Sequence, residues 1–112
     1  MATLSIQSVS ATGLNPTYVS AAGGGDKVKP GSATFIHVKN GGGASVTVTV
    51  DDALSTAPSG AYQFDPDLKV VVEPGGQRFI GPLPENRFRG TDGYAAITYS
   101  GVSSVTVAAL RV

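Results

Sequence analysis

The side chains that could support catalysis are few in this chain of 112 residues. His37 is the single histidine, and the absence of cysteine excludes thiolate metal sites, iron–sulfur clusters and disulfides. A serine–histidine–aspartate triad needs a nucleophile on a sharp turn, and no GxSxG segment supplies one. Because His37 falls in the middle of the predicted strand Thr34–Lys39, we expect a packed or surface side chain. We therefore predict that the protein is not an enzyme.

Aspartates occur in two pairs that could bind a cation, Asp51-Asp52 and Asp65-Pro66-Asp67. Calcium is bound by several oxygen ligands that converge, usually from a loop. The two pairs border one long connection, Asp51–Asp67, and could therefore meet. Neither pair has the DxDxDG spacing of a calcium loop, and solvated aspartates at strand ends explain both. The prediction is therefore no metal and no cofactor, with calcium as the alternative.

Charge and glycine patterning argue against nucleic acid and nucleotides as ligands. The chain has 8 Lys+Arg and 8 Asp+Glu, whereas phosphate binding depends on clustered cations. Gly23–Gly25 and Gly41–Gly43 lack the spacing of phosphate-binding glycine loops. No apolar run reaches the roughly 18 residues that a membrane span needs, so no membrane is expected either. The mildly basic positions, which suit salt bridges to a protein partner, are Lys27, Lys29, His37, Lys39, Arg87 and Arg89.

Strand and turn signals predict an all-β fold. The clearest strand is Val46–Val50, where valines alternate with threonines. Glycine and proline, with 15 and 7 residues, interrupt nearly every longer stretch, and no helical stripe is present. Asn40–Ala44 is predicted to form a hairpin loop and Pro74–Gly76 a turn. We predict one domain over residues 1–112, an antiparallel two-sheet β-sandwich or jelly-roll-like barrel of about seven or eight strands.

The two ends of the chain carry further predictions. In the last predicted strand the apolar positions change phase after Val107, because Leu110 and Val112 point the opposite way. A bulge near Ala108-Ala109 would reconcile the two phases. At the other end, residues 1–25 are predicted to form an extended arm and loop, with a strand at Leu4–Val9.

A set of short segments along the chain carries a family resemblance. The segments are Asn15-Pro16-Thr17-Tyr18, Thr34–Gly42, Val46–Val50, Val71–Pro82, Arg87-Phe88, Gly93-Tyr94, Ile97–Ser100 and Ser104–Ala109. Together they resemble small all-β proteins that are encoded beside the major capsid protein in tailed phages, particularly phages of actinobacteria. The resemblance covers about two-thirds of the chain and leaves out Asp51–Leu68. Because the segments are hairpins and core strands, they imply a fold and a setting rather than a chemistry.

The resemblance implies a head decoration (cement) or minor capsid protein, which is a structural component of the virion. Its partner would be the major capsid protein, whose subunits it would bridge and stabilise on the capsid surface after synthesis in the host cytoplasm. A homo-oligomer, with a trimer expected, would multiply the contacts. The expected contact regions are two extended, proline-marked segments that end at Tyr18 and Phe88. Their contact residues are Leu14, Asn15, Pro16, Tyr18, Pro82, Pro84, Arg87 and Phe88. Deletion of Met1–Asn15 is expected to abolish capsid binding and to leave the sandwich folded.

Two other functions are consistent with the sequence. One is a head–tail connector or tail component of a phage, since small β-sandwiches recur there. The other is a carbohydrate- or surface-binding β-sandwich module, because Tyr62 and Phe64 in the long connection could form an aromatic platform. Copy number per particle separates the first from a decoration protein. Glycan binding or a calcium-dependent melting shift would favour the second.

Overall fold

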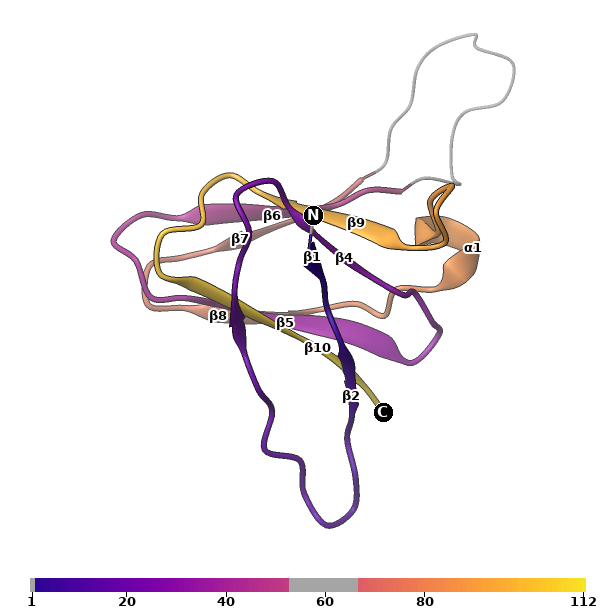
Figure 1. The fold of residues 1–112 in the computed structure, drawn as a ribbon. Helices are drawn as coiled ribbons and strands as arrows, with labels where there is room; N and C mark the ends of the chain where they lie inside the picture. The colour runs from indigo at the N-terminus through magenta and orange to yellow at the C-terminus, as the bar shows by residue number, and fades with distance from the viewer. Residues whose placement is uncertain (1, 53–66) are drawn as a thin grey trace, which may run out of the picture.

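The computed structural model describes residues 2–52 and 67–112, which form two five-stranded sheets packed face to face (Figure 1). Sheet A has the strand order β1, β4, β9, β6, β7, with bounds Ala2–Thr3, Asp26–Val28, Ala95–Tyr99, Val46–Val50 and Leu68–Val72. Sheet B has the order β2, β10, β5, β8, with bounds Ile6–Ser8, Val105–Arg111, Thr34–Asn40 and Gln77–Ile80. Strand β3 (Val19–Ser20) also pairs with β10. The one helix of the described residues is α1 (Glu85–Phe88).

Alternation along the central strands builds the core between the two sheets. In β6, Val46, Val48 and Val50 are buried and the two threonines between them are half-buried, which confirms the predicted strand. From sheet B, Ile36 and Val38 of β5 are fully buried in the same cluster. Other core residues of the described chain are Val28, Val72, Ile80, Leu83, Phe88, Ala95, Ile97, Val105 and Val107.

The prediction of a β-rich fold with two packed sheets is confirmed, but its antiparallel hairpin arrangement is wrong. Both sheets are mixed, because β1 runs parallel to β4 and β2 runs parallel to β10. From β4 onward the chain changes sheet at every connection except that between β6 and β7. The strands of the described residues do not close into a barrel. Glycine and proline signal a turn, and a turn serves a crossing between sheets as well as a hairpin.

The predicted hairpin loop after Asn40 is one of these crossings, and the buried Asn40 side chain holds it in place. Its Nδ2 donates hydrogen bonds to the carbonyl oxygens of Ala44 (2.7 Å) and Val72 (3.0 Å). Its Oδ1 accepts a bond from the Gly42 amide at 3.0 Å. The Asn40 carbonyl also accepts a bond from the Gly75 amide, which lies in the turn between β7 and β8 (2.8 Å). One residue therefore joins two crossings at the same end of the sandwich.

Strand β10 is continuous, so the predicted bulge near Ala108-Ala109 is wrong. Its register with β5 runs without interruption along all seven residues. Val105, Val107 and Ala109 belong to the core between the sheets. Ala108 and Leu110, on the opposite face, are also buried, at 2% and 5% exposed. The change of apolar phase therefore reflects a strand that is covered on both faces.

The segment that was expected to be an arm contributes three strands to the sandwich. After β1, at the edge of sheet A, the chain crosses to sheet B, where β2 and β3 both pair with β10. Leu4, between β1 and β2, is 6% exposed and lies in the core. Residues 9–18, between β2 and β3, extend beyond the two layers, and we call them the projecting loop (Figure 1). The short N-terminal strands raise the number in the described residues above the predicted seven or eight.

Truncation of two leucines tests this division of the N-terminal segment. Leu4→Ala should lower the free energy of unfolding by about 2–4 kcal/mol, because it leaves a cavity in the core. Leu14→Ala in the projecting loop, where the side chain is half-buried and outside the core cluster, should cost less than about 1 kcal/mol. Urea denaturation of both variants measures the difference. Equal losses would contradict the placement of Leu4.

Candidate functional site

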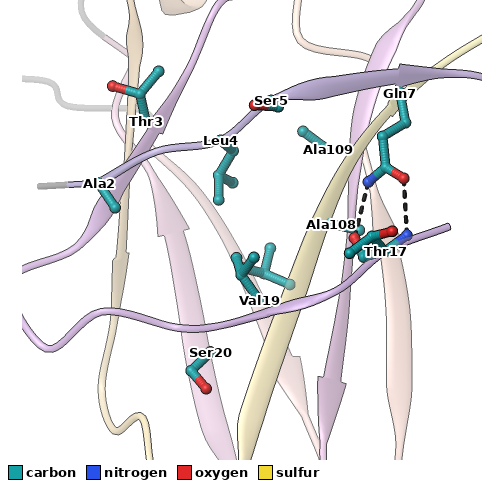
Figure 2. A pocket seen from close by; sticks show the side chains of 11 residues that line it. Ala2, Thr3, Leu4, Ser5, Gln7, Thr17, Val19, Ser20, Ala108 and Ala109 are labelled. Carbon is teal, nitrogen blue, oxygen red and sulfur yellow. Dashed lines mark hydrogen bonds between the residues drawn. The ribbon is translucent and has the colours of Figure 1, made fainter.

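A groove of about 460 Å³ lies where the N-terminal segment passes from sheet A to sheet B (Figure 2). Leu4 and Val19 lie across it from each other, and Ala108 and Ala109 of β10 also line it. None of the described residues that line it carries an ionisable side chain. The serine and threonine hydroxyls along it therefore have no acid or base beside them in the described lining.

The Gln7 side chain joins the two segments that border this groove. Its Nε2 donates a hydrogen bond to the Thr17 carbonyl at 2.9 Å, and its Oε1 accepts one from the Thr17 amide at 2.8 Å (Figure 2). This pair of bonds has the pattern that a residue of a neighbouring antiparallel strand would make. The amide of Gln7 thus fixes the base of the projecting loop to β2.

Four ring side chains lie in contact on the outer face of sheet B, and we call them the aromatic row: Phe35, Phe79, His37 and Tyr18. The register of β5 and β8 places His37 opposite Phe79, and the two rings are stacked with centroids 4.0 Å apart. Phe35 meets Phe79 edge to face at 6.0 Å, and Tyr18 meets His37 edge to face at 5.5 Å. Lys39 Nζ lies 4.0 Å from the centroid of the Tyr18 ring, as in a cation–π pair.

His37 ties the projecting loop to sheet B. Its Nδ1 lies 2.5 Å from the Tyr18 hydroxyl, while Nε2 is buried without a hydrogen-bond partner in the described residues. Burial lowers the pKa of His37, the nearby charge of Lys39 lowers it further, and the Gln77 side chain opposes the change. The imidazole is therefore neutral at neutral pH. Of the two positions expected for His37, packed or surface, the structure shows the packed one, and its hydrogen bond with Tyr18 joins the loop to the sheet.

The aspartates at the start and end of the long connection meet, but they are held by protein groups. Asp52, whose side chain is fully buried, accepts a bond from Arg87 Nε at 2.6 Å. The Asp52 amide donates to Asp67 Oδ1 at 2.9 Å. Burial raises the pKa of Asp51, and the carboxylates of Asp67 and Asp52 raise it further.

The calcium alternative gains no support from these carboxylates. Residues 2–52 and 67–112 contain no group of three His, Cys, Asp or Glu side chains that could hold a metal ion. Asp65, which belongs to the expected pair, lies outside the described residues, as do Tyr62 and Phe64 of the expected aromatic platform.

The expected contact residues of the N-terminal segment lie on the projecting loop. Leu14, Pro16 and Tyr18 are half-buried, whereas Asn15 and Thr17 between them are exposed. Of these residues, Tyr18 reaches His37 on the outer face of sheet B.

The expected contact residues of the second segment do not form an extended edge. Pro82 is exposed and Pro84 half-buried, but residues after Pro84 form the helical turn α1. Phe88 is 1% exposed and belongs to the core, so its prediction as a contact residue is corrected: the ring fills the sandwich interior. Arg87 is engaged with Asp52. Figure 1 shows α1 at one end of the sandwich, away from the tip of the projecting loop, so the two regions do not form one surface.

Phe79 is the prominent surface residue that sequence reasoning missed. Its side chain is 68% exposed on the edge strand β8, beside a hollow of about 300 Å³. The alternation of Phe79 with the buried Ile80 is the signal that could have found it.

No protein-family model, curated protein or solved structure matches this chain. In the part of the chain that the structure describes, no helix is long and apolar enough to cross a membrane.

The pH dependence of stability tests the burial of His37. Because the pKa is lowered in the folded state, the unfolded chain takes up a proton first as the pH falls below the ordinary value of 6.5. The free energy of unfolding should therefore fall from pH 6.5 down through the lower pKa of the folded state, and level off below it. Urea denaturation across this range measures it. His37→Gln should flatten the dependence, whereas Tyr18→Phe should keep most of it; equal slopes in His37→Gln and the parent would contradict the assignment.

The ion pair between Arg87 and Asp52 makes a second prediction. Arg87→Met removes the guanidinium that neutralises a buried carboxylate and should lower the free energy of unfolding by about 1–3 kcal/mol. Arg89→Met, at an exposed position two residues on, should change it by less than about 0.5 kcal/mol. Thermal and urea denaturation measure both variants. A loss no larger for Arg87 than for Arg89 would show that the pair contributes nothing.

Proposed function

We propose that this chain is a structural protein of a tailed-phage head, a decoration protein that binds the outer surface of the shell and joins neighbouring subunits of the major capsid protein. The observation that carries the proposal is the projecting loop, a binding element whose two ends are fixed to a rigid sandwich. The resemblance of the sequence to small proteins encoded beside the major capsid protein supports the same role. The described residues offer packed β-structure and exposed apolar side chains rather than a reactive centre.

The projecting loop is held at its base by three contacts. The Val9 amide donates to the Arg111 carbonyl at 2.8 Å, which fixes the outgoing chain to the end of β10. The bonds from Gln7 to Thr17 and from Tyr18 to His37 fix the returning chain. A loop whose ends are fixed in this way loses less conformational entropy on binding than a free arm would.

Between these ends the loop reverses through a short turn. The Gly13 amide donates to the Ser10 carbonyl at 3.0 Å, and Gly13 adopts a φ of 95°, which glycine reaches without strain. Val9 is 46% exposed and Leu14 half-buried, so apolar surface lies on both sides of the turn. The loop thus presents a shaped, mostly uncharged surface to a protein partner.

Repetition on the shell would strengthen a modest contact. A standard protein interface buries about 800 Å² on each partner, and a single loop contributes only part of that. Oligomerisation, proposed here as a trimer, would let several loops bind at once and would raise the overall affinity through the effective concentration. Disassembly of the shell would then require these bridges to break as well.

Binding to particles tests the proposal. Quantitative mass spectrometry of purified particles should find the protein at a stoichiometry close to that of the main shell protein; only a few copies per particle would favour the connector or tail alternative. Leu14→Asp should weaken binding of the purified protein to particles that lack it at least about tenfold, since it places a charge in the contact. Val71→Ser, at an exposed position on the outer face of sheet A, is the control and should bind normally. Absence of the protein from particles, or full binding by Leu14→Asp, would contradict the proposal.

Carbohydrate binding is the second candidate, because the exposed ring of Phe79 resembles part of an aromatic platform. The described lining of the hollow beside the ring includes one hydroxyl side chain, Ser32, and otherwise apolar groups and glycine, and the imidazole of His37 stacks against the ring. Sugar recognition needs several oriented hydrogen-bonding groups as well as a ring. The observed surroundings of Phe79 therefore favour a protein partner over a glycan.

A further inference from the structure

We propose that the face around Phe79 is a self-complementary surface through which two copies of this chain associate about a two-fold axis. Phe79 projects from the edge strand β8 with 68% of its surface exposed. An exposed phenylalanine on a surface is unexceptional alone, but this ring stands directly beside a hollow. The inference concerns a two-fold contact between copies in solution, separate from the trimer proposed on the shell, and does not rest on the proposed capsid role.

The hollow next to Phe79 has a volume of about 300 Å³ and is shaped by the backbone. At Gly81 an added Cβ would lie 2.6 Å from Phe35 Cβ, and φ is 150°, so only glycine fits between β8 and β5 there. The ring of Phe35 and the exposed Pro82 form two of its walls. Its volume lies at the small end of the range for ligand clefts, which suits one ring-sized side chain. The complete described lining is Ser32, Ala33, Phe35, Phe79, Gly81, Pro82 and Val112.

A second copy is the occupant that this geometry favours. In an interface about a two-fold axis the same patch is used twice, so a projecting group and its receptor must lie on one surface, as Phe79 and the hollow do. None of the described residues lining the hollow has an ionisable side chain, so no like-charged side chains face each other where two identical linings meet. An entering Phe79 ring would meet Phe35, which already packs edge to face at 6.0 Å with its own Phe79, the arrangement aromatic pairs prefer.

Association through the face is favoured over strand addition at the edge of β8. Arg78 lies opposite Val38 in the register, so its side chain projects from the core side of the edge strand. It is held there by Glu73 at 2.6 Å and by the Gln77 carbonyl at 2.7 Å. A charged residue on the inner side of an edge strand opposes pairing with another strand. The contact between copies therefore uses the rings and the hollow.

Sedimentation equilibrium of the full chain, from micromolar to millimolar concentration, tests the inference. The parent protein should show a reversible monomer–dimer equilibrium. Phe79→Ser removes the projecting ring, and Ala33→Trp fills the hollow while leaving Phe79 in place; each should raise the dimer dissociation constant at least about tenfold. Val71→Ser removes a similarly exposed apolar side chain from sheet A and should leave the equilibrium unchanged. Circular dichroism checks that every variant is folded.

Several results would overturn the inference. A parent protein that stays monomeric over the whole range would do so, as would dimers that persist in both Phe79→Ser and Ala33→Trp. Loss of shell binding in Phe79→Ser, with no dimer in the parent, would identify the face as a contact for the shell protein instead. Leu14→Asp separates the two proposals, because it should lose shell binding and keep the dimer.

Discussion

The architecture depends on the occupation of both edges and both faces of β10. One edge pairs with β5, and the other is shared by β2, which runs parallel to β10, and β3, which runs antiparallel. β2 pairs with the end of that edge as far as Ser8 and β3 pairs farther along it, so the chain between them leaves the edge as the projecting loop. On its return Tyr18 contacts His37, which lies opposite the buried Ala108 on the outer face of sheet B.

The fold could be predicted where local alternation decides it, and not where distant segments do. The inward valines of Val46–Val50 follow from a period of two, and so does the strand that holds His37. Whether the chain after Asn40 returns to its own sheet or crosses to the other is set by pairing with remote strands, because the same turn residues serve both. The parallel pairing of β1 with β4, and of β2 with β10, leaves no local signal in the sequence. Parallel strands cannot be joined by a tight turn, so the paired segments lie far apart along the chain.

The features of the candidate site also fall into those that local sequence predicts and those that depend on distant segments. The place of His37 in a strand could be predicted, but its packed position and its bond to Tyr18 depend on how the loop returns. Phe88 was expected at a surface because two prolines precede it, yet a single helical turn after Pro84 rotates its ring into the core. Phe79 was overlooked because exposure of an outward ring depends on what covers the sheet, and β8 is an edge strand with no cover over that ring in the described residues.

The bidentate link from Gln7 to Thr17 has a consequence for how such a protein can diversify. Hydrogen bonds of Gln7, Val9 and Tyr18 hold the base of the loop. Insertions or substitutions among residues 10–16 are therefore expected to leave the packing of the sandwich interior unchanged. Folding and the proposed binding of a partner are thereby assigned to separate stretches of the polypeptide. Substitutions at the tip of the loop would change the proposed binding surface without destabilising the sandwich.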